Sequence, residues 1–170
     1  IANLLLILFT CCNPSNFKSD QVLTAILDKD AATISVFTGN KNKPILVQNA
    51  KSGFRPYLHP IVAPDGKGLL TENRPEHHSH QTGLYWGFTR VNGKKMVIDS
   101  LMNFFYEPKT EEQKAIKGRD YFHNPGKEYW KRLSFDIIDS IGKKVRWQTV
   151  YFMLGANGEP LMKETQVWSL

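Results

Sequence analysis

The sequence predicts an all-β protein in which two antiparallel sheets pack face to face as a β-sandwich. Three observations support this fold class. Apolar and polar residues alternate with a period of two from residue 21 onward, whereas sustained helical periodicity is nearly absent. Turn signals rich in Gly, Pro, Asn and Asp separate the alternating runs. The run Val145–Leu154 becomes apolar on both faces toward its end, which is typical of a sandwich or a curved sheet.

The first part of the chain contains four runs with strand character. They are Val22–Asp28, Thr33–Thr38, Lys43–Val47 and Arg55–Ala63. The first two flank Asp28-Lys29-Asp30, which predicts a hairpin. Pro56 and Pro60 bar a helix and confine the fourth run to an edge strand or an irregular strand. The following Pro64–Gly68 predicts a turn, because Pro presets φ and Gly supplies a positive φ.

The second part of the chain predicts a hairpin, a helix and a meander. Asn92-Gly93 lies between Leu84–Val91 and Lys95–Asp99, and this dipeptide is a strong hairpin signal. Thr110–Lys117 is the one expected helix, since it starts with a capping Thr and two early acidic residues. The meander comprises Tyr129–Ile138, Val145–Leu154 and Leu161–Leu170.

Composition limits the class of protein further. The 170 residues carry a net charge of +6, with 41% apolar and 22% charged residues, which excludes a disordered tail and a coiled coil. The basic residues do not gather into one block, so no nucleic-acid partner is expected. One domain, or part of one, is the expected organisation.

The N-terminal segment predicts export. The apolar run Leu4–Phe9 precedes Cys11, and this order resembles a bacterial lipobox in which Cys11 is lipidated. We therefore expect residues 1–20 to be signal and tether. The protein would then be secreted, periplasmic or anchored to the outer membrane, and it would contact a membrane only through its lipid. A plain signal peptide and a buried strand with two core cysteines are the alternatives. Residues 21–170 are expected to be the N-terminal portion of one sandwich domain that is incomplete at its C-terminus.

The segment Arg55–Phe88 concentrates chemically useful side chains, including four of the five histidines. Residues i and i+2 of an extended chain point the same way, so His78 and His80 can aim at one point. Imidazole both gives and takes protons near neutral pH, which makes these two the candidate catalytic residues. The remaining candidates are expected to bind substrate: Arg55, His59, Glu72 and Trp86.

Other interpretations of these residues stay open. The spacing of His78 and His80 also forms a usable metal arm, with His59 or Glu72 as a third ligand for copper or iron. Metal is not the favoured interpretation, and the cofactor requirement is unknown. Trp86 is either a stacking platform or a core aromatic. His123, in a second aromatic-rich stretch, is interpreted as an ordinary loop residue.

These motifs carry a resemblance to a known family. The string RPYLHPI at residues 55–61, followed by His78-Ser79-His80 and Gly83–Trp86, resembles a secreted bacterial domain family labelled PmoA-like or methane oxygenase. Its members have Pro where this chain has Ser79, and a third His where it has Gln81. The resemblance implies a β-sandwich similar to that of galactose mutarotases, in a Bacteroidota-type envelope protein. No run after Phe9 is long enough to span a bilayer, so the oxygenase label is not taken as an activity.

The function expected from the resemblance and the histidines is binding or processing of a carbohydrate or polyol in a His-rich pocket. A metal-dependent oxidoreductase is one alternative. A non-catalytic glycan-binding or adhesion module is another. Whether the protein is an enzyme is left open by the sequence.

Overall fold

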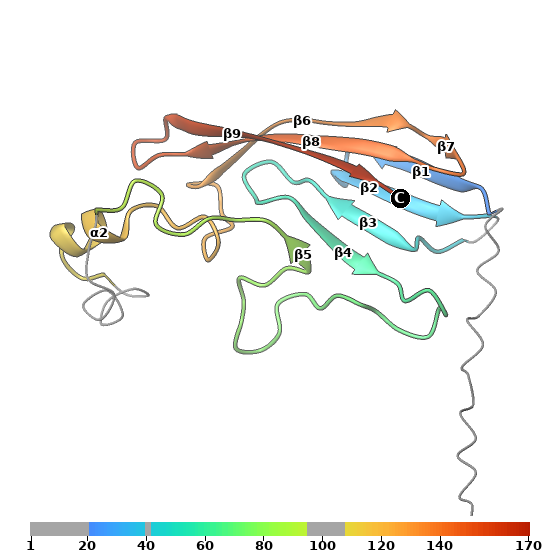
Figure 1. The fold of residues 1–170 in the computed structure, drawn as a ribbon, viewed down its shortest axis with the longest axis horizontal. Coiled ribbons are helices and arrows are strands. Elements are labelled where there is room, and N and C mark those ends of the chain that lie inside the picture. The colour runs from blue at the N-terminus through green and yellow to red at the C-terminus, as the bar shows by residue number, and fades with distance from the viewer. Residues whose placement is uncertain (1–20, 40–41, 95–107) are drawn as a thin grey trace, which may run out of the picture.

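The computed structural model describes residues 21–39, 42–94 and 108–170. Most of these residues form two antiparallel sheets that lie one above the other (Figure 1). The larger sheet has the strand order β5-β4-β3-β2-β1-β7 and the smaller has the order β6-β8-β9. Both sheets are open, so the fold is a sandwich and not a closed barrel. The all-β, two-sheet prediction is confirmed.

The strands of the larger sheet are short. They are β1 (Leu23–Asp28), β2 (Thr33–Thr38), β3 (Leu46–Asn49), β4 (Tyr57–Ile61), β5 (Leu84–Tyr85) and β7 (Ile141–Gly142). The smaller sheet consists of the longer strands β6 (Trp130–Asp139), β8 (Arg146–Leu154) and β9 (Pro160–Ser169). The predicted first hairpin and the predicted meander are therefore confirmed.

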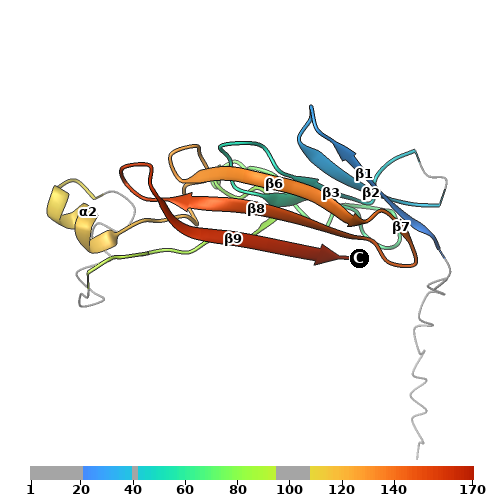
Figure 2. The same ribbon diagram turned by 90° about the horizontal axis from the view of Figure 1, so that it is seen from above.

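The two sheets share one hydrophobic core. The larger sheet contributes buried residues such as Ile34, Val36 and Leu58, and these pack against Val145 and Trp147 of the smaller sheet. Burial of large apolar side chains on both inner faces is the main force that holds two sheets together. Figure 2 shows the smaller sheet as a long curved layer beside the larger one.

Polar bonds also join the sheets. The indole Nε1 of Trp147 donates to Oε1 of the buried Gln48 at 3.2 Å. The Tyr151 hydroxyl donates to the carbonyl of Lys51 at 3.1 Å. Because buried polar groups cost free energy when left unpaired, these bonds fix how the sheets align.

A second buried cluster attaches the loop between α2 and β6 to the smaller sheet. Tyr121 and Trp130 pack with Tyr151 and Met153, and all four side chains are buried. The hydroxyl of Tyr121 donates to the carbonyl of Leu154 at 2.8 Å. This loop therefore has a fixed position beside the sandwich, which matters because it carries candidate site residues.

The predicted helix is confirmed as α2 (Glu111–Lys117), which lies at one end of the molecule in Figure 1. Thr110 caps it, and the side chain of Gln113 completes a reciprocal capping box. Within the described residues, no helix has the length and apolar character required to span a membrane.

Three predicted strands differ from the structure. Leu84–Val91 is a strand only at Leu84–Tyr85, which pairs with β4, and Val91 instead forms an isolated bridge to Arg119. The prediction was wrong because Gly87 approaches the backbone of Phe122 and Asn92 adopts a positive φ, so the segment cannot continue as a regular strand. Its expected partner, Lys95–Asp99, lies outside the described residues.

The other two differences are shifts of boundary and position. The strand expected at Lys43–Val47 is β3, which begins three residues later and ends two residues later. The strand expected within Arg55–Ala63 is β4, which is irregular, as predicted, because its register with β3 shifts. It is not an edge strand, since β5 pairs with its other side.

The predicted turn at Pro64–Gly68 is present, with Gly66 at a φ of 72°. The signal and tether expected at residues 1–20, including Cys11, lie outside the described residues.

Candidate functional site

One buried arginine holds together the two loops that carry the candidate residues. Arg55 is separated from the start of β4 by Pro56 and is fully buried. Its guanidinium donates to the carbonyl of His80 at 2.5 Å, to that of Tyr121 at 3.3 Å, and to that of Phe122. Its central carbon lies 3.3 Å from the ring centroid of Tyr85. Burial lowers the pKa of Arg55 to about 10, which leaves it charged at neutral pH.

These contacts give Arg55 a positioning role. A planar guanidinium carries five donors in a fixed fork, so it can satisfy carbonyls from two loops at once. The sequence predicts that Arg55 contacts a substrate. The structure places its two terminal nitrogens on backbone carbonyls and on the Thr82 hydroxyl inside the protein, while the buried Nε has no partner among the described residues.

The loops held by Arg55 bring three imidazoles together, which we call the imidazole cluster: His78, His80 and His123. The ring centroids of His80 and His123 are 4.8 Å apart, and those of His78 and His80 are 5.8 Å apart. Phe122 contacts both His80 and His123. His78 and His80 therefore lie close together, as their spacing predicts. His123 lies in the same cluster, although the sequence favoured an ordinary loop role for it.

A buried carboxylate lies behind one of these imidazoles. Asp120 accepts from Nδ1 of His123 at 2.9 and 3.1 Å and from the backbone amide of His123 at 3.1 Å. The ammonium group of Lys117 lies 3.4 Å from the same carboxylate. Only 2% of the Asp120 side chain is exposed, compared with 21% of the His123 side chain. The carboxylate is thus shielded while the imidazole reaches solvent.

His80 has a perturbed environment. Burial lowers its pKa, and the neighbouring His123, His78 and Arg55 lower it further, while Asp120 opposes the shift. His80 is therefore neutral at physiological pH. A neutral imidazole keeps one N–H donor and one lone pair.

His59 does not join this cluster in any contact of the described residues. Its Nδ1 lies 2.9 Å from the hydroxyl of Thr71. Among the residues that the structure describes, no group of three or more His, Cys, Asp or Glu side chains is arranged to hold a metal ion. The metal set of His59, His78 and His80 considered from the sequence is consequently not assembled.

Glu72 lines a small cavity of about 410 Å³ next to the imidazole cluster. The same cavity is lined by Gln81 and Phe122, which are the chain neighbours of His80 and His123. Glu72 itself is exposed at the rim. It therefore remains a candidate contact for a ligand in this cavity.

Trp86 lies in a different hollow, which we call the aromatic groove. The groove has a volume of about 720 Å³ and runs between the segment that begins with β5 and the strand β9. Its lining includes Trp86, Phe88, Met153, Met162, Glu164, Gln166 and Trp168. The Trp86 side chain is 62% exposed, so the interpretation of Trp86 as a core aromatic is wrong.

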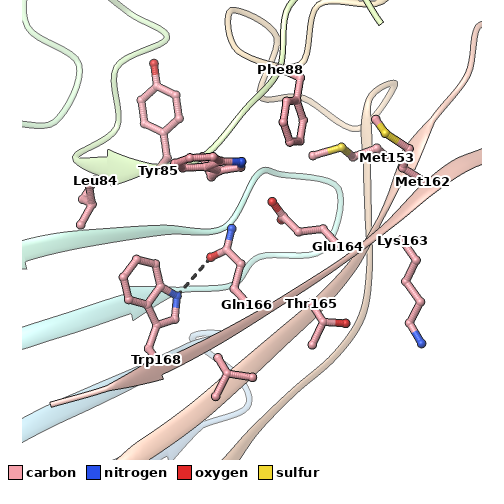
Figure 3. Close-up of a pocket in the computed structure, with 12 residues that line it drawn as sticks. Leu84, Tyr85, Phe88, Met153, Met162, Lys163, Glu164, Thr165, Gln166 and Trp168 are labelled. Atoms are coloured by element: carbon pink, nitrogen blue, oxygen red, sulfur yellow. Dashed lines mark hydrogen bonds between the residues drawn. The ribbon is translucent and has the colours of Figure 1, made fainter.

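Polar groups lie on the β9 side of the groove. Figure 3 shows Glu164 and Gln166 extending from β9 toward Phe88, while Lys163 and Thr165 extend to the other side of the strand. Trp168 donates from its indole to Oε1 of Gln166 at 3.1 Å. This alternation follows from the period of two along a strand.

Two polar atoms in the groove are buried without a hydrogen bond. Oε2 of Glu164 and Nε2 of Gln166 have no partner among the described residues. Burial raises the pKa of Glu164, although the Gln166 amide and the Arg55 guanidinium oppose that shift. One acceptor and one donor of the groove lining thus lack a hydrogen-bond partner among the described residues.

Three residues of the groove were not predicted from the sequence: Glu164, Gln166 and Trp168. Their signal was the alternation of the last strand, which places all three on one face together with Met162. We interpreted that strand only as part of the meander. Alternation identifies a shared face but not the segment opposite it, so the contact with the β5 segment could not be inferred.

The fold and these hollows define an antiparallel β-sandwich with two candidate binding sites separated by Tyr85. The chain belongs to the family of unknown function DUF6807, whose model matches residues 43–170. No curated protein and no solved structure matches the chain. The match covers both the imidazole cluster and the aromatic groove.

Proposed function

We propose that this protein binds a carbohydrate or a related polyol in the aromatic groove. The observation that carries the proposal is the combination of exposed aromatic surface with an unpaired carboxyl and an unpaired amide in one hollow. A sugar presents a flat apolar C–H face and a rim of hydroxyls that both donate and accept. An aromatic ring complements the first, and carboxyl and amide groups complement the second.

Trp86 supplies the aromatic surface. Its ring is 62% exposed and makes a T-shaped contact with Phe88, with centroids 6.2 Å apart. Large aromatic side chains at an exposed hollow are typical of binding sites, because water contact is unfavourable for their apolar faces. A sugar ring stacked on Trp86 would remove this surface from water.

Glu164 and Gln166 supply the polar contacts. Each has a buried atom without a hydrogen-bond partner among the described residues, and such an atom costs about 1–3 kcal/mol. A ligand hydroxyl can donate to Glu164 and accept from Gln166, which relieves both costs. Burial raises the pKa of Glu164, which means that this site disfavours charge, and a neutral ligand adds none.

The proposal places this binding at the cell envelope. The expected lipid on Cys11 would hold the domain at a membrane surface, where it would meet extracellular or periplasmic glycans. The expected similarity to PmoA-like proteins and to the galactose-mutarotase sandwich belongs to the same proposal. A glycan-binding module needs no catalytic group, so the aromatic groove alone is sufficient for this function.

The test is a screen of neutral and acidic mono- and oligosaccharides by isothermal titration calorimetry. We expect a neutral sugar to bind, and Trp86→Ala to weaken its Kd by about tenfold or more, since a lost stacking contact of about 1.4 kcal/mol has that effect. Trp86→Phe should retain part of the affinity, because it keeps an aromatic face.

The matched control is Leu133→Ala on β6, which also removes an exposed apolar side chain but lies outside the groove lining. It should leave the Kd unchanged. Binding that is equally strong in Trp86→Ala, or the lack of binding by any sugar in the screen, would refute the proposal.

A further inference from the structure

We propose that the aromatic groove takes an extended, neutral glycan chain of several sugar units and not a single sugar. This inference rests on the proposed function, because it names the size and shape of the carbohydrate that the same groove would bind. Two observations carry it beyond the side chains described above. They are the length of the groove along β9 and a row of backbone groups on the open edge of that strand.

The groove extends along most of β9. Every residue from Met162 to Trp168 lines it. A strand rises about 3.3 Å per residue, so this part of β9 is about 20 Å long. The opposite wall is formed by the segment from Leu84 to Phe88, which contains no helix or turn. A pyranose ring is no longer than one indole ring, so a single sugar would occupy only part of the groove.

Apolar surface is present at both ends of the groove and between them. Figure 3 shows Trp168 and Leu84 toward one end, and Met162 and Phe88 toward the other. The exposed Trp86 lies between Leu84 and Phe88 in the chain. Successive sugar rings of one chain can therefore stack at Trp168, Trp86 and Phe88.

The open edge of β9 adds a row of backbone hydrogen-bonding groups. Among the described strands, β9 pairs with β8 alone. The N–H and C=O of Leu170 both bond to Val145, immediately before β8. Because this direction alternates along an antiparallel strand, the backbone groups of Lys163, Thr165 and Val167 point away from β8. These three residues line the groove, so its wall presents N–H donors and C=O acceptors about every 7 Å.

This row suits a repeating ligand that carries hydroxyl groups. A hydroxyl both donates and accepts, so each sugar unit can bond to either kind of backbone group. The backbone groups are uncharged, which agrees with a neutral chain. The wall is a strand of ten residues, and an extended glycan can follow it, whereas a strongly curved glycan would leave it after one or two units.

Two residues of β9 oppose the addition of a polypeptide strand at the same edge. Pro160 begins the strand, and the exposed Lys163 projects from it. Proline and lysine at exposed edges hinder strand pairing in natural sheets. The open backbone groups are thus better suited to a glycan than to a second copy of this chain or to an extended peptide.

The experiment measures Kd by isothermal titration calorimetry with the intact chain. The ligands are glucose, mannose and xylose and their β-1,4-linked oligomers of up to six units. We expect the affinity to increase with chain length, so that the best hexasaccharide binds at least about tenfold more tightly than its monosaccharide. Maltohexaose is the matched control, because it has the glucose units of cellohexaose in a curved chain, and it should bind no more tightly than glucose.

The outcomes separate this inference from the proposed function. A monosaccharide that binds as tightly as its hexasaccharide, or maltohexaose that binds as tightly as the best β-linked chain, would overturn the inference and leave the proposed function intact. Binding of another neutral sugar but none of these series would do the same. The lack of binding by any sugar would refute the proposed function itself.

A second measurement needs no variants, since it uses nitrogen-15 spectra of the wild-type protein. The best hexasaccharide should shift the indole N–H groups of Trp86 and Trp168 and the backbone amide of Val167. The backbone amide of Leu133, on the other edge strand of the smaller sheet, should not shift. Shifts at only one of the two indoles would overturn the inference. Slow hydrogen exchange at Lys163, Thr165 and Val167 without sugar would also overturn it, because another strand would then occupy the edge.

Discussion

At the scale of single residues, Arg55 decides the geometry of both candidate sites. It is buried, it stacks on Tyr85 and it donates to carbonyls in two loops that are far apart in sequence. The local sequence around Arg55 predicts a functional residue, but it does not predict which groups the guanidinium contacts. Its partners are 25 to 67 positions away along the chain, and local patterns carry no information about such contacts.

Substitution of Arg55 tests this positioning role. Arg55→Ala would leave three carbonyls without their donor, and each unpaired group costs about 1–3 kcal/mol. We expect the free energy of unfolding in urea to fall by about 3 kcal/mol or more. Arg55→Lys should recover only part of the loss, because an ammonium cannot form the same fork. A change of less than about 0.5 kcal/mol in the alanine variant, the range of ordinary surface substitutions, would contradict the role.

Glu164 predicts a specific dependence of stability on pH. Its folded pKa lies above the ordinary value of 4.5, because burial disfavours the carboxylate. Between the unfolded and the folded pKa, the folded protein binds more protons, so the contribution of Glu164 to stability falls as pH rises through that window.

Glu164→Gln removes this dependence. We expect the variant to gain stability relative to the wild-type protein as the pH is raised from about 4 to about 7, where the wild type holds a buried charge. The measurement is the urea midpoint of both proteins at the two pH values. A stability difference that stays constant with pH would show that Glu164 titrates as it does in the unfolded chain.

At the scale of elements, regular strands could be predicted and irregular ones could not. β8 and β9 are long strands of nine and ten residues, so their existence followed from the sequence. β5 has two residues and depends on the close approach of Gly83 to β4. A glycine in a strand indicates a bulge or a close approach of this kind, but it does not indicate which strand is approached. Only part of the imidazole cluster could be predicted, because local patterns do not report contacts between distant segments. His78 and His80 lie in one run, while His123 is brought to them by tertiary packing.

Gly83 is the residue that allows β5 to pair with β4. It adopts a φ of +92°, and a Cβ there would lie 2.3 Å from the carbonyl oxygen of Leu58. Gly83→Ala should cost about 1–3 kcal/mol of stability and separate β5 from β4. Faster amide hydrogen exchange at Tyr85 and Leu58 would report that separation.

The control for this substitution is Gly126→Ala. Gly126 has open space around the position of a Cβ and does not adopt a left-handed φ. It should therefore leave both stability and exchange at Tyr85 close to wild type. If the two alanine variants behave alike, the close approach of β4 and β5 does not determine the position of the groove.

At the scale of the whole molecule, the sandwich places two hollows on either side of Tyr85. The smaller sheet contributes β9 to the aromatic groove, and the loops beyond the larger sheet contribute the imidazole cluster. Trp147 and Gln48 connect the sheets through a buried hydrogen bond, so the distance between β9 and the β5 segment is set by the core. The fold class followed from the sequence, but the groove did not, because it requires the relative position of both sheets.

The central claim is that a neutral carbohydrate binds in the aromatic groove. The most direct measurement is a titration of the nitrogen-15-labelled protein with the tightest sugar from the calorimetric screen. The side-chain amide of Gln166 and the indole N–H of Trp86 should shift in the spectrum, and the buried indole of Trp147 should not. Shifts confined to the imidazole cluster, or none at Gln166 and Trp86 at saturating sugar, would contradict the account.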